Sequence, residues 1–461
     1  MNLAHSHGAS QAAAITPAPR FAERLGWSLV LVPVFVCAAV VPLLPPLGWK
    51  VQTTVAGLLL QTGGLYILAR LGILRGSPLD RPALAFLGAT VLATIFSVDR
   101  MVSFYPSPLR GEGLPVYAAY IVAALAAARL THRGGAVLLA VALAGGTVMG
   151  LVALAQFYGL DLLAIAGFHP VRPEVELAGG MRGFIFEPMS IGWRSTGTLG
   201  QSMVLGGLAA LLLPTGVTLT VLARRTLPAL LHGVATMMVY GALIASGTRA
   251  AWVATAVAGG LLLWLLPRTP LTWRRMVTLA AGLTVMTVLM AMSRPQAALP
   301  QRLTSIAGEM RSSDQSLGQR LYIWRHTIAL SVRRPLLGWG FSTLLGRFPD
   351  YGSAEYRQKF GQGEVHLIDN PHNELLHLLY STGLVGLAAY LWVWKVSASY
   401  LLRDIRLKTE GSGRSLALLA SLCAYFIWMQ SAWSHIGVAN VFWVVLGLAA
   451  GLRDHPAERR H

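Results

Sequence analysis

The sequence predicts an all-α polytopic membrane protein with about twelve transmembrane helices and two long extracytoplasmic loops. Of its 461 residues, 54% are hydrophobic and only 12% are charged, and the mean hydropathy is +0.57. Soluble proteins carry about 25% charged residues, and disordered chains are poor in hydrophobic ones. A nucleic-acid-binding protein can reach the net charge of +18, but it would not also be this apolar. Cys37 and Cys423 lie far apart in apolar runs, so neither a disulfide framework nor a cysteine metal site is expected.

Membrane-spanning helices need about 20 mostly apolar residues. Twelve stretches of the chain meet this description, each about as long as a membrane is thick. They lie at about 26–44, 51–69, 82–98, 114–130, 136–157, 201–222, 228–246, 250–267, 275–292, 372–395, 415–434 and 436–452.

The distribution of lysine and arginine orients these spans, because short cytoplasmic loops are enriched in both. With the N-terminus inside, every cytoplasmic turn is basic, whereas the short outer loops hold Lys50, Arg100, Arg110 and Arg249. We therefore expect both termini to be cytoplasmic, and we see no secretory signal in the first 24 residues. The expected division is a tail at 1–25, a transmembrane domain at 26–452 with outer loops at 158–200 and 293–371, and a tail at 453–461.

The second outer loop contains an amphipathic segment, Leu317–Leu330. Its apolar residues recur at about one helical turn, and Trp324 and basic residues accompany them. This pattern predicts a helix that either lies on the outer membrane surface or packs as a buried loop helix.

Ionisable residues at membrane depth mark functional sites, and four clusters on the predicted outer side qualify. The first, Arg194-Ser-Thr-Gly-Thr-Leu-Gly-Gln201, precedes a span; its turn would expose backbone N–H groups that bind an anion together with Arg194. The alternative is an arginine that extends to the lipid headgroups. In the second cluster, Ser246–Trp252, Arg249 occupies a short outer turn where orientation does not require it, which favours function over chance.

The third cluster places Arg320 and Trp324 on one face of the loop helix, where they form either a ligand contact or a structural cap. The fourth opens a span with Asn370 as the expected N-cap, followed by Pro371 and His372. The positive end of the helix dipole would keep His372 neutral, and therefore able to accept a proton. His372 and His377 are five residues apart on different helix faces, so a metal site is not expected.

These clusters together contain the groups needed to displace a pyrophosphate with an alcohol. Arginines bind a pyrophosphate leaving group bidentately, without a metal, and a neutral histidine deprotonates the attacking hydroxyl. The residues alone do not name the substrate.

At these motifs the chain resembles the O-antigen ligase/polymerase superfamily. The similarity covers roughly residues 185–395 and includes Arg194–Gln201, Ser246–Arg249, Arg320 with Trp324, Pro335-Leu-Leu-Gly-Trp-Gly340, and Pro371–Leu376 with Gly383-Leu-Val-Gly386. The first motif departs from the family pattern, because Leu-Gly-Gln-Ser replaces an aromatic residue and Asn-Pro-Asn.

This resemblance implies a GT-C-like fold and transfer of a glycan from undecaprenyl pyrophosphate to an acceptor hydroxyl at the outer face of the bacterial inner membrane, with no cofactor. By the resemblance, Arg194 and Arg249 bind the donor pyrophosphate, with Arg320 as a weaker match, and His372 is the catalytic base. Asn373 acts near His372, and Trp324 and Gln201 are further substrate contacts.

Several activities remain open within this superfamily. We favour O-antigen ligation to lipid A–core over O-antigen polymerisation, in which a second lipid-linked glycan is the acceptor. A protein O-oligosaccharyltransferase is less favoured, because such members carry a further C-terminal region and this chain ends soon after its last span. A lipid-linked glycan flippase is the alternative of another class, although transporters show repeats and midplane charges. A peptidoglycan polymerase is less favoured still.

Overall fold

A computed structural model gives the architecture of the chain. It describes residues 17–45, 47–74, 76–105, 111–168, 174–176, 182–184, 194–294, 315–348, 368–409 and 411–451. Residues 1–16, the C-terminal tail and parts of both long outer loops therefore lie outside the described residues, whereas residues 17–25 of the predicted N-terminal tail belong to the first helix.

Each of the twelve predicted spans contains a described helix. These helices are α1 (Pro17–Ala39), α2 (Leu47–Arg70), α3 (Asp80–Ile95), α5 (Leu114–Ala127), α6 (His132–Phe157), α8 (Ser202–Leu222), α9 (Thr226–Ser246), α10 (Arg249–Leu265), α11 (Pro270–Ser293), α16 (Glu374–Leu407), α17 (Ser412–Met429) and α18 (Ile436–Gly451). Among the described residues, eight helices are long and apolar enough to cross a membrane; α5, α10 and α18 are apolar but shorter. The chain is thus a helical, polytopic membrane protein, and the number of twelve crossings stays a prediction.

Shorter elements lie in the loops. They are η1 (Val41–Leu43), α4 (Arg100–Phe104), α7 (Leu162–Ile165), α13 (Gln315–Arg333), α14 (Leu344–Arg347) and the antiparallel strands β1 (Glu174–Glu176) and β2 (Arg182–Phe184). Helix α13 confirms the helix predicted at Leu317–Leu330. It packs against α16 through Ile323 and leaves Leu321 and Val332 exposed, so it has both a buried face and an exposed apolar one.

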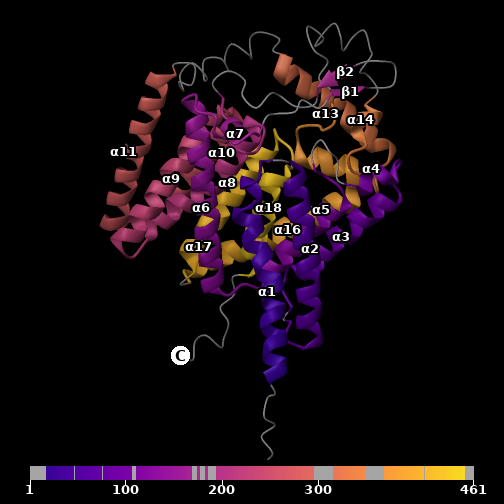
Figure 1. Cartoon of the computed structure of the whole chain (residues 1–461), viewed down its shortest axis with the longest axis horizontal. Helices are drawn as coiled ribbons and strands as arrows, with labels where there is room; N and C mark the ends of the chain where they lie inside the picture. The colour runs from indigo at the N-terminus through magenta and orange to yellow at the C-terminus, as the bar shows by residue number, and fades with distance from the viewer. Residues whose placement is uncertain are drawn as a thin grey trace, which may run out of the picture.

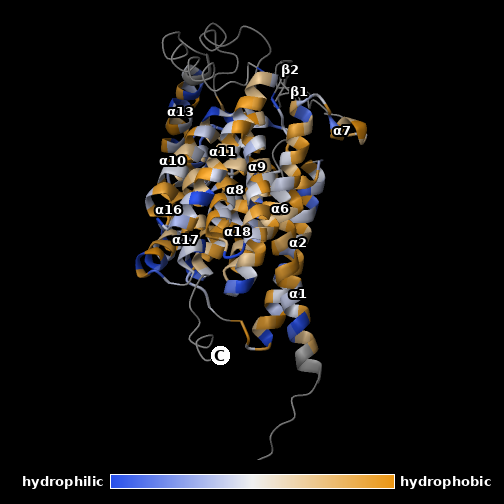
Figure 2. Cartoon of the chain, turned by 90° about the vertical axis from the view of Figure 1, so that its left-hand side faces the viewer, coloured by the Kyte–Doolittle hydropathy of each residue, from blue (hydrophilic) through white to orange (hydrophobic). Residues whose placement is uncertain are grey.

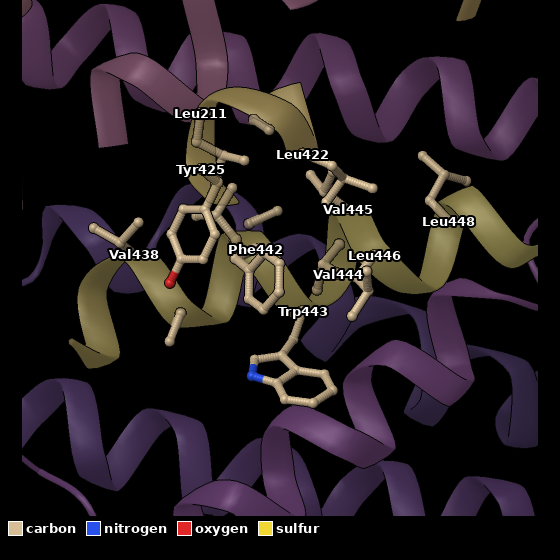
Figure 3. Close-up of a cluster of buried hydrophobic side chains, with 14 of the residues drawn as sticks. Leu211, Leu422, Tyr425, Val438, Phe442, Trp443, Val444, Val445, Leu446 and Leu448 are labelled. Carbon is tan, nitrogen blue, oxygen red and sulfur yellow. The ribbon is translucent and has the colours of Figure 1, made fainter. Parts of the chain in front are cut away.

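The core of the bundle is centred on α18, whose side chains are buried along nearly its whole length. Phe442 of α18 stacks on Tyr425 of α17 with ring centroids 4.2 Å apart (Figure 3). Gly447 and Gly451 allow close contact with α5, because a Cβ atom at Gly447 would lie 2.1 Å from the carbonyl oxygen of Ala124. Small residues spaced four apart commonly permit such packing between membrane helices.

One end of the bundle, which we call the site end, is where α8, α10 and α16 begin. The loop elements α4, α7, α13 and α14 and the two strands gather at this end (Figure 1). Hydrophobic residues cover much of the helix surfaces between the two ends (Figure 2).

Basic side chains stabilise the opposite end. Arg129 pairs with Asp80 at 3.0 Å, Arg275 donates to the carbonyl of Ala223, and Arg414 donates to the carbonyl of His132. Cations next to helix C-terminal carbonyls are favourable. The predicted cytoplasmic arginines therefore also serve as helix-end contacts.

Helix α16 differs from its prediction at both ends. It begins at Glu374 with Asn373 as N-cap, whose Oδ1 accepts from the Leu376 N–H at 3.1 Å, so the prediction of Asn370 as N-cap was wrong. It also continues to Leu407, beyond the predicted end at residue 395. A kink at Gly383 (φ 65°, ψ −166°) interrupts it near the site end.

Candidate active site

Two of the four sequence clusters form one unit at the site end. The Arg194 side chain donates from Nε to the carbonyl oxygen of Ser246 at 3.0 Å. The Ser195 N–H donates to the carbonyl of Ala245 at 2.9 Å, and the Thr248 hydroxyl donates to the carbonyl of Ser202 at 3.0 Å. Gly247 provides the left-handed turn (φ 58°) that ends α9 just before α10 begins. The loop before α8 and the turn between α9 and α10 are thus hydrogen-bonded to each other.

Backbone N–H groups in the middle of the first cluster bind within the protein, and the anion-binding role of this cluster stays a prediction. The Thr196 and Gly197 N–H groups both donate to Oε1 of Gln156, at 3.2 and 2.8 Å, and the Thr198 N–H contacts the sulfur of Met149. With the Ser195 N–H also bonded, these donors already have acceptors within the protein. An anion at this segment would therefore be bound by the guanidinium of Arg194.

Gln156 and Lys50 support this segment, and sequence reasoning did not single them out. The Gln156 amide also donates to the Gly197 carbonyl at 3.2 Å, and the buried Lys50 donates from Nζ to the Thr198 carbonyl at 3.1 Å. Lys50 had the signal that identified Arg249, namely a basic residue in a short outer loop. Nothing in the sequence links Gln156 to a loop forty residues away.

Arg320 connects the third cluster to the second. Burial lowers the pKa of Arg320 below its ordinary value, and the positive charge of Arg249 lowers it further. Like charges repel each other, so the two guanidinium groups raise the positive potential of this part of the site end. The two arginines therefore form a shared positive region between α10 and α13.

Trp324 connects the third cluster to the fourth. Its indole Nε1–H donates to the carbonyl oxygen of Pro371 at 2.8 Å, one turn along α13 from Arg320. His372 follows directly, and its ring packs edge-on against Trp433 with centroids 4.7 Å apart. The segment carrying His372 is thereby held between α13 and the turn joining α17 to α18.

The two residues after His372 tie α16 to the same turn. The Asn373 amide donates to the carbonyl of Gln430 at 3.1 Å, and Oε2 of the buried Glu374 accepts from the Ser434 N–H at 2.8 Å. Gln201, in contrast, is buried at the N-cap of α8, and within the described part of the chain its side-chain carbonyl has no hydrogen-bond partner. Among the described residues, no group of three or more His, Cys, Asp or Glu is placed to hold a metal ion.

Comparison with known families decides the identity of this region. Residues 233–391 match the family model for O-antigen ligase. The chain carries an O-antigen ligase family domain. This match confirms, over that part of the chain, the resemblance found in the motifs, and it supports a glycosyltransferase of the O-antigen ligase/polymerase type. No curated protein matches the chain.

The O-antigen ligase domain contains Arg249, Arg320 and His372. Arg194 and Gln201 precede the matched residues, but Arg194 reaches the domain through its hydrogen bond to Ser246. The site therefore combines the family domain with the loop that precedes α8.

Proposed function

We propose that this protein transfers a glycan from undecaprenyl pyrophosphate to an acceptor hydroxyl at the outer face of the inner membrane, and that the reaction is O-antigen ligation to lipid A–core. The observation that supports it best is that Arg249 and Arg320, whose charges repel each other, both lie within the segment matched to the O-antigen ligase family, where they can bind an anion together. A pyrophosphate is such an anion, and arginine binds its oxygens bidentately.

The residues divide the chemistry between them. The acceptor oxygen attacks the anomeric carbon, and its proton passes to the imidazole of His372. The bond between that carbon and the pyrophosphate oxygen breaks, and undecaprenyl pyrophosphate leaves with the electron pair. Arg194, Arg249 and Arg320 stabilise the charge that develops on the leaving group, a role for which no metal is needed. Gln201, Trp324 and Asn373 are assigned as further substrate contacts in this proposal.

The basic turns at the opposite end support the proposed orientation, because they place the site end outside under the positive-inside rule. Arg194 and Arg249 would then face the periplasm, where an acceptor on the outer leaflet is accessible.

The test uses purified full-length protein in lipid nanodiscs with a lipid-linked O-antigen donor. Lipid A–core, a second donor molecule and a protein acceptor are supplied separately, and released undecaprenyl pyrophosphate and glycan products are measured by mass spectrometry. Glycan attached to lipid A–core supports ligation. A longer glycan that is still lipid-linked would show that the reaction is polymerisation and not ligation. Movement of donor between the leaflets of vesicles without a new glycosidic bond would overturn the transferase proposal. Loss of activity in EDTA that Mg²⁺ restores would overturn metal independence.

A further inference from the structure

His372 has a backbone conformation that needs support. Its φ of 52° lies in the left-handed region, which is unfavourable for a residue with a side chain. The side chain of Asn370, which is fully buried, provides this support, since its Oδ1 accepts from the His372 N–H at 2.8 Å. The position of the proposed base therefore depends on how Asn370 is held.

The Nδ2 group of Asn370 defines which ring nitrogen of His377 carries the proton. Because Oδ1 accepts from a backbone N–H, the remaining atom is the Nδ2 donor, and it lies 3.2 Å from Nδ1 of His377. A ring nitrogen that accepts a hydrogen bond carries no proton, so this pairing assigns the imidazole proton to Nε2. The hydrogen bonds thus favour one tautomer of a buried histidine.

Glu112 lies at the Nε2 side of that ring. Its Oε2 is 3.3 Å from Nε2 of His377, and the two side chains are 4% and 3% exposed. Glu112 precedes α5, far from the O-antigen ligase motifs in sequence. A buried carboxylate is costly unless it is paired, so its position at ion-pair distance from the His377 ring is a specific one.

We propose that Glu112 and His377 are positioning residues for His372, acting through Asn370. The chain runs from the Glu112 carboxylate to the His377 ring, to the Asn370 amide, and to the backbone N–H of His372. It ends on a backbone amide, so it orients the base and carries no proton to or from it. Glu374 also interacts electrostatically with His377 and Glu112, while its Oε2 accepts from the Ser434 N–H. This inference rests on the proposed function for the role of His372 in catalysis.

The test compares Glu112→Leu, which removes the polar contact with the His377 ring, with Glu112→Gln, which keeps a polar group of the same size beside Nε2. Small displacements of a catalytic group cost up to about 100-fold in rate. We expect Glu112→Leu to lower kcat for glycan transfer about 10- to 100-fold, with KM and binding stoichiometry for the lipid-linked donor unchanged, and Glu112→Gln to stay within about threefold of wild type. The stoichiometry excludes a smaller fraction of folded protein as the cause.

A second variant covers the case in which Glu112→Leu does not fold. His377→Phe keeps a ring next to Phe341, whose centroid is 6.2 Å from that of His377, and removes both ring nitrogens. The same loss of kcat is expected. If the folded variants keep wild-type kcat, or if Glu112→Gln loses as much as Glu112→Leu, the proposal is overturned.

A measurement without turnover separates this inference from the proposed function. Carbethoxylation of His372 by diethyl pyrocarbonate, followed by peptide mass spectrometry, reports how firmly the ring is held against Trp433. We expect faster modification in Glu112→Leu and His377→Phe, and the wild-type rate in Glu112→Gln. If wild-type protein transfers no glycan, the proposed function fails, and the modification rates still decide the positioning role. Equal rates in all four proteins would refute it.

Discussion

The indole Nε1–H of Trp324 donates a 2.8 Å hydrogen bond to the carbonyl oxygen of Pro371. This bond joins the loop helix α13, which carries Arg320, to the segment that carries His372. It is therefore a direct link between the arginine region and the proposed base.

Replacing Trp324 by Phe removes the donor and keeps an aromatic ring. A hydrogen bond contributes about 0.5–1.5 kcal/mol, so we expect glycan transfer to fall by about 2- to 10-fold with the thermal stability little changed. Trp264→Phe is the matched control, because Trp264 is exposed on α10. Equal rates for both variants and wild type would show that the link has no role in turnover.

Replacing His372 by Ala tests the base itself. General base catalysis contributes about 10²- to 10⁴-fold, so transfer should fall by at least about 100-fold while the variant inserts and purifies normally. His232→Ala, near the opposite end of α9, serves as control. Transfer at the wild-type rate by His372→Ala would remove His372 from the mechanism.

Arg320→Gln should separate stability from function. The pKa of Arg320 is lowered in the folded protein, which means that its charged form is less favourable there than in the unfolded chain. Without ligand, removing this charge should raise the free energy of unfolding by up to about 1 kcal/mol, because it relieves repulsion with Arg249. Inorganic pyrophosphate should raise the melting temperature of wild type more than that of the variant.

Thermal unfolding in detergent, with and without pyrophosphate, checks this expectation, and the exposed Arg268→Gln at the opposite end is the control. A variant that is less stable than wild type without ligand, and equally stabilised by pyrophosphate, would contradict a binding role for Arg320.

Gln156→Ala tests the support of the Arg194 loop. The change leaves the Thr196 and Gly197 N–H groups without their acceptor, which should lower the free energy of unfolding by about 1–3 kcal/mol. We expect a lower melting temperature and a lower affinity for the donor, since Arg194 begins this loop. Gln52→Ala on the exposed side of α2 should change neither quantity. Unchanged donor affinity in a destabilised Gln156→Ala would limit Gln156 to a structural role.

The sequence predicted the elements well because each span is a long apolar run and each orienting turn is basic. It also singled out Arg249 and His372 as candidates, because a charge in an outer turn and a histidine before a span have few structural explanations, and their roles stay predictions. The start of α16 was misplaced because Asn370 and Asn373 are both good caps, and only the buried contacts of Asn370 with His372 and His377 decide between them.

The hydrogen bonds of the Thr196 and Gly197 N–H groups in the first motif were not predicted, for a similar reason. A Gly- and Thr-rich turn exposes N–H groups only if nothing packs over it, and Gln156 of α6 does. Contacts of this kind join residues that are distant in sequence, and one amino-acid sequence alone does not predict them. The same holds for Glu112 and His377.

The motifs Pro335–Gly340 and Gly383–Gly386 contact each other at the kink of α16. Replacing Gly383 by alanine, which adds one methyl group, tests this contact. The Trp339 N–H donates to the carbonyl of Tyr380 at 2.8 Å, and the Leu384 N–H donates to the carbonyl of Pro335 at 2.7 Å. Gly383 lies between these bonds with φ 65°, and a Cβ atom there would lie 2.2 Å from the carbonyl oxygen of Leu336. Position 383 therefore requires glycine, because of both its backbone conformation and the lack of space for a side chain.

We expect Gly383→Ala to cost more than about 2 kcal/mol, because a left-handed conformation alone costs a residue with a side chain about 1–2 kcal/mol and the clash adds to it. Separation of the two motifs would also displace α13 from α16, so transfer should fall together with stability. Gly260→Ala is the control, since a Cβ atom at Gly260 on α10 meets nothing within 4 Å. Alanine there should leave the melting temperature unchanged or raise it, because alanine favours helix by about 1 kcal/mol over glycine. Equal melting temperatures for the two variants would show that the kink tolerates a side chain and that the two motifs do not depend on this contact.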